Sequence, residues 1–222
     1  MQNPLLLALS ILAILLFISF YLISSLLYKG RHKQKYHFYQ MFPYEFNYPS
    51  VFKENPYGNF LFIGAAFLGA TVYILNPYIS IYKTITIAMA IVFTMVLICL
   101  IMMPLYYLKT HMALSIVSMT LAMALPLFNL LMAYNQYKVE PNSMKQVLMI
   151  ISMVFSGILA LIMIALILNP RLTFKIYLDK ETDGNGQEVL KRPKIIPLAL
   201  TEWVSILVYF LSTVSVVLIN LL

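Results

Sequence analysis

The stretch LLLALSILAILLFISFYLISSLL, from Leu5 to Leu27, decides the fold class because it is long, apolar and free of charge. A helix of about 20 apolar residues can cross the hydrocarbon core of a bilayer. A secretory signal has a shorter apolar core of about 7–15 residues behind a basic head. The head MQNP has neither Lys nor Arg. We therefore predict a retained transmembrane helix.

Five further segments share this length and apolarity. Of the 222 residues, 62% are hydrophobic and only 10% charged, against about 25% charged in a typical soluble domain. We predict one all-α polytopic membrane domain over residues 1–222, with six transmembrane helices. The predicted spans are Leu5–Leu27, Asn59–Asn76, Thr84–Tyr107, Met112–Tyr134, Gln146–Asn169 and Leu198–Asn220.

The basic residues predict the orientation. Twelve of the 15 Lys and Arg residues fall in loop 28–58, in loop 170–197 or at Lys109. Because cytoplasmic loops carry the excess of Lys and Arg, these two loops are expected in the cytoplasm and both termini outside. The short remaining loops and bare termini favour the plasma membrane of a bacterium. The chain would then be a multi-pass protein of that membrane.

Loop 28–58 is basic first and aromatic afterwards. Tyr and Trp favour the headgroup zone, and basic side chains are attracted to an anionic inner leaflet. We predict a cytoplasmic interfacial loop, broken by prolines, that contacts membrane lipids or a protein partner. Attachment to membrane spans argues against a nucleic-acid partner. The candidate lipid- or partner-facing residues are Lys29, Arg31, Lys33, Lys35, Tyr36, Tyr39, Tyr44 and, at the start of the last span, Trp203.

Loop 170–197 predicts a cytoplasmic β-hairpin. Apolar residues alternate from Leu172 to Leu178, and the turn sequence Asp183–Gly186 follows. The same segment resembles a calcium loop in part. Its twelfth position, where such loops need a bidentate Glu, is Leu190, which argues against a calcium site.

Glu202 is the one acidic residue inside a predicted span. A carboxylate in a membrane is costly and is therefore a functional candidate. One interpretation pairs it with Lys194, Arg192 or Lys109 near the headgroups. The other makes Glu202 and His111 a weak candidate catalytic pair. The sequence offers no metal-ligand spacing or phosphate-binding loop, and its lone cysteine cannot form a cluster, so no metal and no cofactor are predicted.

Small residues predict close helix packing. Ala65 with Gly69, and Ala66 with Ala70, recur four residues apart, and Asn129 is an amide deep in a span that should bond to a neighbouring helix. The second and fifth spans both end in Ile-Leu-Asn-Pro, which is weak support for two inverted three-helix halves.

Three classes of function remain. The favoured one is a non-catalytic membrane subunit or scaffold that docks a partner through its cytoplasmic loops. A small transporter or channel for an uncharged solute or lipid is the alternative. The weak repeat and the Asn-Pro breaks support it, and the near absence of charge in the spans opposes it. The third is an inner-leaflet lipid-modifying enzyme that uses His111 and Glu202. The sequence identifies no ligand, no partner and no oligomeric state.

Overall fold

The fold is a bundle of six long helices. A computed structural model describes residues 4–32, 35–47, 55–77, 81–102, 108–172, 179–182, 188–191 and 193–221. The helices are α1 (Pro4–His32), α3 (Pro56–Ile74), α4 (Ile81–Met102), α5 (Leu108–Val139), α6 (Ser143–Ile167) and α7 (Pro197–Asn220). All six are long and apolar enough to cross a membrane, as predicted. They make the chain compatible with a polytopic membrane protein.

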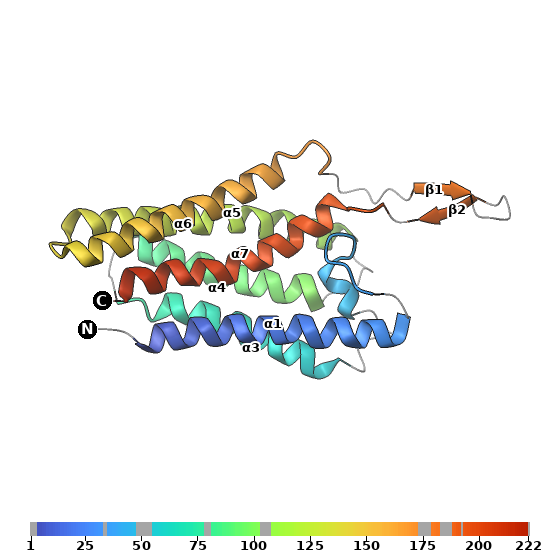
Figure 1. The fold of residues 1–222 in the computed structure, drawn as a ribbon, viewed down its shortest axis with the longest axis horizontal. Helices are drawn as coiled ribbons and strands as arrows, with labels where there is room; N and C mark the ends of the chain where they lie inside the picture. The colour runs from blue at the N-terminus through green and yellow to red at the C-terminus, as the bar shows by residue number, and fades with distance from the viewer. Residues whose placement is uncertain are drawn as a thin grey trace.

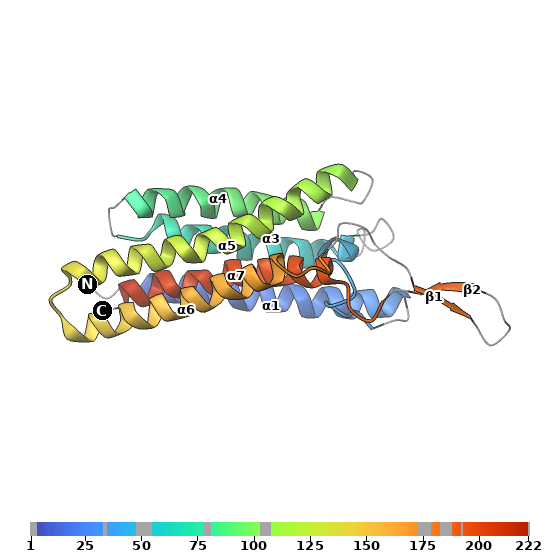
Figure 2. The same ribbon diagram turned by 90° about the horizontal axis from the view of Figure 1, so that it is seen from above.

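The helices run side by side along the long axis, and α7 lies between α1 and α6 (Figures 1 and 2). The start of α1, the end of α7 and the α5–α6 connection share one end of the bundle, which we call the termini end. A short 3-10 helix, η1 (Pro43–Asn47), lies at the opposite end. Strands β1 (Asp179–Thr182) and β2 (Glu188–Lys191) extend beyond it, so we call this the strand end.

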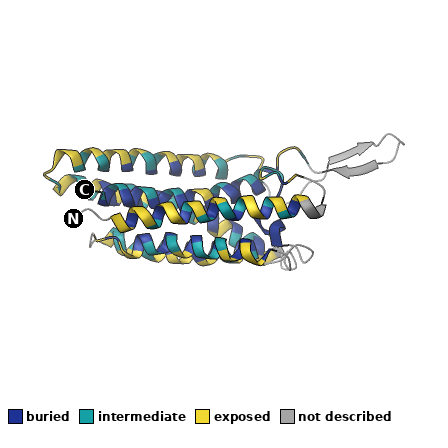
Figure 3. Ribbon diagram, turned by 60° about the horizontal axis from the view of Figure 1, so that its bottom comes forward, coloured by how far each residue is buried: buried dark blue, intermediate teal, exposed yellow. Residues whose placement is uncertain are grey.

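The outer faces of the bundle are apolar. Leu26 and Leu161, for example, are 69% and 65% exposed, and exposed residues follow the outer helices along their whole length (Figure 3). Contiguous apolar surface of this extent is rare on a soluble monomer. Lipid chains would cover it.

Helix α7 is the central element, and 72% of its most apolar 18-residue stretch is buried inside the protein. Its side chains bond to each of the other five spans. Glu202 contacts His111 of α5, Tyr209 contacts Ala66 of α3 and Thr94 of α4, Thr213 contacts Ser10 of α1, and Ser215 contacts Ser156 of α6. Because lipid is as apolar as leucine, such bonds and tight packing, and not the hydrophobic effect, hold membrane helices together.

The small residues of α3 lie where it approaches α7. Ala65, Ala66, Gly69 and Ala70 are all buried. The hydroxyl of Tyr209 donates to the Ala66 carbonyl at 2.8 Å, directly beside Gly69. Because Gly69 has no side chain, the Tyr209 ring can lie directly against the backbone of α3.

Asn129 bonds to two neighbouring helices. Its Nδ2 donates to the hydroxyl of Tyr73 on α3 and to the Ser212 carbonyl on α7, both at 3.0 Å. Asn129 is fully buried. The amide thus ties α5 to two helices at the middle of the bundle.

The two Asn-Pro helix ends have the same local geometry. Helix α3 ends with Leu75 in the αR conformation before Asn76, and α6 ends with Leu168 in that conformation before Asn169. The third helices of the two halves differ in burial, however. The most apolar 18-residue stretch of α4 is 44% buried, whereas that of α7 is 72% buried. The halves are therefore unequal in packing.

Two predictions differ from the structure, one about the length of the fourth span and one about the loop after α1. The fourth span was predicted from Met112 to Tyr134, but α5 begins at Leu108 and continues to Val139. The loop after α1 was predicted along the membrane interface, but Tyr36–Asn47 packs against the helices. Six of its residues are at most 4% exposed, among them Tyr36, Tyr44 and Glu45. The rings of Tyr36 and Phe46 pack on each other, as do those of Phe42 and Tyr44. This segment contacts α1, α4 and α7, and its rings are buried there and not in a headgroup layer.

The two strands form a short antiparallel ladder in the segment for which a hairpin was predicted. Asp179 pairs with Lys191 and Thr182 with Glu188. The predicted turn at 183–186 lies outside the described residues. Which side of the membrane carries these strands stays a prediction.

We expect Gly69→Ala to destabilise the bundle. A methyl group there would lie 2.8 Å from Cε1 of Tyr209, whose ring is held by bonds to Ala66 and Thr94. Overpacking of this kind costs about 1–3 kcal/mol. Thermal unfolding in detergent measures the loss. Gly64→Ala is the matched control, because its methyl group would meet only Leu16 at 3.7 Å, and an equal loss there would contradict the steric explanation.

Candidate functional site

The candidate site is the contact between His111 and Glu202 at the strand end. His111 lies in the first turn of α5 and Glu202 in the second turn of α7. Nε2 of His111 lies 3.3 Å from Oε1 of Glu202, and both side chains are buried. The contact is an ion pair when His111 is protonated.

Ser115 completes the site from the same face of α5. It follows His111 by one helical turn, which places both side chains toward α7. Its hydroxyl donates to Oε1 of Glu202 at 2.6 Å. A carboxylate that accepts a hydrogen bond from a hydroxyl group and contacts an imidazole is placed as a general base would be.

Aromatic rings of the loop close this site. The ring of Tyr44 meets the ring of His111 edge to face at 4.6 Å, and Phe42 stacks on Tyr44 at 5.3 Å. Phe42 and Tyr44 are each 2% exposed. The rings exclude water from the pair, and in a medium of low polarity the interaction of two charges is stronger than in water.

The loop 36–47 is held in place by its own polar groups. The Glu45 carboxylate accepts from the backbone N–H of Phe42 at 3.0 Å, which caps η1. The Tyr36 hydroxyl donates to the carbonyls of Met41 and Phe42 at 3.0 and 2.7 Å. Trp203 of α7 donates its indole N–H to the Tyr36 oxygen and to the Met41 carbonyl. We call residues 36–47 the plug.

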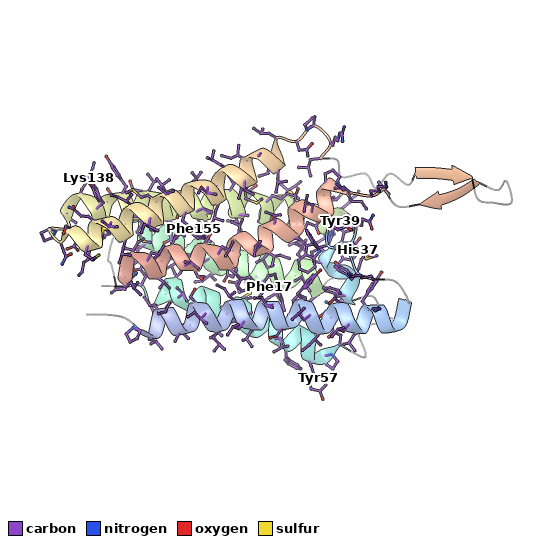
Figure 4. The ribbon with its side chains drawn as sticks, viewed as in Figure 1. Phe17, His37, Tyr39, Tyr57, Lys138 and Phe155 are labelled. Atoms are coloured by element: carbon purple, nitrogen blue, oxygen red, sulfur yellow. The ribbon has the colours of Figure 1, made fainter. Side chains whose placement is uncertain are left out.

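The plug is also bonded to other parts of the chain. The side-chain amide of Asn47 donates to the Ile101 carbonyl at the end of α4 at 2.9 Å. The backbone N–H of Ile196 donates to the Tyr39 carbonyl at 2.8 Å, just before α7 begins. The plug thus links the ends of α4 and α7, and Figure 4 shows His37 and Tyr39 beside the start of α7.

Two buried atoms of the pair have no hydrogen-bond partner among the described residues. They are Oε2 of Glu202 and Nδ1 of His111, and Nε2 of His111 has only its 3.3 Å contact with Oε1 of Glu202. Buried polar atoms usually have a hydrogen-bond partner. An unpartnered polar atom inside a membrane protein is therefore a position where a proton, a water molecule or a polar ligand could bind. Within the described ranges, no group of three or more His, Cys, Asp or Glu residues could hold a metal ion.

The structure distributes the predicted site residues unevenly. It brings His111 and Glu202 together, and it does not pair Glu202 with Lys109 or Lys194, which are both exposed. Lys29 and Lys35 are exposed at the strand end, whereas the side chains of Arg31 and Lys33 lie outside the described set.

Three of the residues expected to face lipid are buried. Tyr36, Tyr44 and Trp203 are 4%, 2% and 5% exposed. The Tyr36 hydroxyl and the Trp203 indole N–H bond within the plug, and the Tyr44 ring packs against His111, so that part of the prediction needs correction. Tyr39 is partly exposed and its hydroxyl lies 3.2 Å from Nδ1 of His37.

Sequence reasoning missed Ser115 and Glu45. Ser115 follows His111 by four residues in the sequence, and that spacing could have indicated a shared helix face. Glu45 follows Pro43 by two residues, as an acidic residue in the first turn of a short helix often does. Nothing local indicated that the plug would cover the pair.

The chain matches no protein-family model, no curated protein and no solved structure. Its function must therefore be inferred from the chemistry of its own residues.

We expect His111 and Glu202 to be energetically coupled. Glu202→Leu leaves the buried His111 without its carboxylate partner, and breaking a buried pair costs about 3–5 kcal/mol. The Ser115 hydroxyl can still donate to the His111 carbonyl at 2.9 Å. Adding His111→Leu should recover part of this loss, because two apolar residues need no partner. A double-mutant cycle of thermal stability in detergent measures the coupling, for which about 1–3 kcal/mol is expected. Additive losses would contradict it.

Tyr36 gives the plug a predicted dependence on alkaline pH. Burial raises the pKa of Tyr36 well above its ordinary value, Glu45 raises it further, and the bond from Trp203 lowers it in part. The folded state therefore prefers the protonated hydroxyl. The protonated Tyr36 hydroxyl contributes fully to stability below the pKa of tyrosine in the unfolded chain, about 10. This contribution is lost as the pH rises beyond that value.

The test compares the wild type with Tyr36→Phe between pH 8 and 11. We expect the stability difference to be constant below about pH 10 and then to shrink by about 1.4 kcal/mol per pH unit. Tyr57→Phe is the control, because Tyr57 is 78% exposed at the edge of the bundle (Figure 4). A difference that did not change with pH would show that the Tyr36 hydroxyl is not protected in the plug.

Proposed function

We propose that the chain is a non-catalytic membrane subunit or scaffold that docks a protein partner through the loops of its strand end. We place it in the plasma membrane of a bacterium, with the strand end in the cytoplasm and both termini outside. The excess of Lys and Arg in the loops of the strand end supports this orientation.

The observation that carries the proposal is the organisation of the strand end. The plug is bonded to α4, to α7 and to the segment before α7, so the loops leave from a fixed base. Bonds of this kind reduce the ordering that a partner must impose, and preorganisation raises affinity. A free interfacial loop would not need them.

The paired strands favour a protein partner. They extend beyond the helices, away from the apolar surface (Figure 1). A two-stranded ladder is marginally stable alone, and the outer edge of each strand has backbone groups that a third strand can pair with. We therefore expect a partner that adds a strand to β1 or β2, a common mode of peptide recognition.

The packed core favours a scaffold over a transporter. The centre of the bundle is filled by α7 and by large buried rings, among them Tyr73, Phe93 and Tyr209. The unequal burial of α4 and α7 also weakens the comparison with inverted-repeat carriers, whose halves move about a site between them.

A lipid-modifying enzyme of the inner leaflet is the second candidate. The contact of Ser115 and His111 with one oxygen of Glu202 supports it, since the three side chains provide a hydroxyl and a base. The plug would have to move before a lipid could reach them, because Tyr44 covers His111.

Purification of the tagged chain in a mild detergent, followed by cross-linking and mass spectrometry, tests the proposal. A stoichiometric partner should cross-link to residues 170–197. Replacing residues 179–191 by Gly and Ser at constant length should remove that partner and leave the melting temperature unchanged. Lys138→Gln with Lys145→Gln, both at the termini end, is the control and should retain it.

Two results would count against a scaffold. One is a partner that stays bound after the replacement. The other is a chain that purifies alone and converts added phospholipid, with conversion abolished by Glu202→Gln while the protein remains folded. That second result would establish the enzyme instead.

A further inference from the structure

An apolar groove runs between α1 and α7 in the half of the bundle nearer the strand end. Its volume is about 250 Å³, and its walls are Phe17 and Ile18 of α1, Trp203 and Leu207 of α7, and Phe38 of the plug. Phe17 lies between the two helices in Figure 4. The indole N–H of Trp203 is already bonded to Tyr36 and Met41, so this wall offers a ring and not a donor.

A second hollow continues along α1 toward the strand end. Its volume is about 370 Å³, and it is lined by Lys29 and Ser25 of α1 and by Lys35 and Tyr36 of the loop. Within the described part of the chain, neither ammonium group has an acidic partner. Two unpaired cations at the edge of a membrane attract a phosphate group.

Tyr21 lines both hollows and joins them. From Phe17 to Lys29 the helix advances about 18 Å, at about 1.5 Å per residue. One leaflet of hydrocarbon is about 15 Å deep, half of a typical bilayer core. The apolar hollow therefore lies at the depth of acyl chains and the lysine-lined hollow at the depth of a headgroup.

We infer that the groove and the lysine-lined hollow form one binding site for a single anionic phospholipid. Its acyl chain lies along Phe17, Ile18 and Leu207, and its phosphate lies between Lys29 and Lys35. The sequence predicts only a diffuse attraction of basic residues to an anionic leaflet. The structure instead assigns Lys29 and Lys35 to one lipid. It also reveals an apolar groove beside them, which the positions of the charges could not predict.

The site is independent of the proposed scaffold role. It lies on the lipid-facing side of α1 and α7, and β1 and β2 take no part in it. The lipid would pack on the outer side of Trp203, whose inner side supports the plug. A retained lipid would thus be a structural part of the strand end.

The single tryptophan of the chain provides the readout. The full chain is reconstituted in phosphatidylcholine vesicles that contain a small mole fraction of phosphatidylglycerol brominated in mid-chain, and quenching of Trp203 is recorded. Preferential occupancy predicts stronger quenching than brominated phosphatidylcholine gives at the same mole fraction. Equal quenching by the two lipids would overturn the site.

Variants separate the two halves of the site. Lys29→Gln with Lys35→Gln should raise the mole fraction of phosphatidylglycerol needed for half-maximal quenching about tenfold. Lys138→Gln with Lys145→Gln removes the same charge at the termini end and should change nothing. An equal effect of the two pairs would overturn the headgroup assignment.

Ile18→Phe with Leu207→Phe fills the groove without touching either lysine. Both side chains are more than 40% exposed, so the larger rings do not strain the core. We expect quenching by brominated phosphatidylglycerol to fall to the level of phosphatidylcholine. Unchanged quenching in a variant with the wild-type melting temperature would overturn the acyl-chain assignment.

Discussion

The burial of a polar helix inside an apolar bundle is the constraint on which the rest of the structure depends. Helix α7 carries Ser, Thr, Tyr, Asn and Glu side chains, and most of its surface is enclosed. In lipid an unsatisfied polar group costs several kcal/mol. Thr201 and Ser205 bond to carbonyls of α7 itself, and other polar side chains of α7 bond to each of the other five spans. The position of every other span is therefore fixed by what α7 must bond to.

The strand end follows from the same constraint. Glu202 and Trp203 are adjacent on α7 and face different partners. Glu202 requires His111 and Ser115, which places the start of α5. Trp203 requires the Met41 carbonyl, which draws the loop after α1 into the bundle. The plug is thus a consequence of two neighbouring polar residues that could not be left in contact with lipid chains.

The sequence predicted the spans well, because span length and the lack of charge are local properties. It also predicted that Asn129 would bond to another helix, since an amide deep in a membrane has no alternative. It failed for Tyr36 and Tyr44, which it placed in the headgroup layer. A tyrosine is suited equally to an interface and to a buried position with one hydrogen bond, and only the tertiary partners decide between them.

The pairing of Glu202 was predictable only in part. The sequence indicated a nearby basic group and a possible contact with His111, but lysines at the helix ends can extend to water and need no carboxylate. The concentration of polar residues in the last span was a local signal that could have identified α7 as the central helix. Its neighbours could not be ordered from that signal alone.

The place of α7 in the chain has a consequence for biogenesis. Synthesis proceeds from the N-terminus, so the helix with the most partners is the last of the six spans to enter the membrane. Until then Ser10, Thr94, Asn129 and Ser156 lack the bonds that α7 supplies. The first five spans can already pack on one another, α1 on α3 and α5 on α4 and α6, but their bundle stays open along the side that α7 later fills. Assembly is completed in a single late step, and insertion and folding of this chain are separated in time.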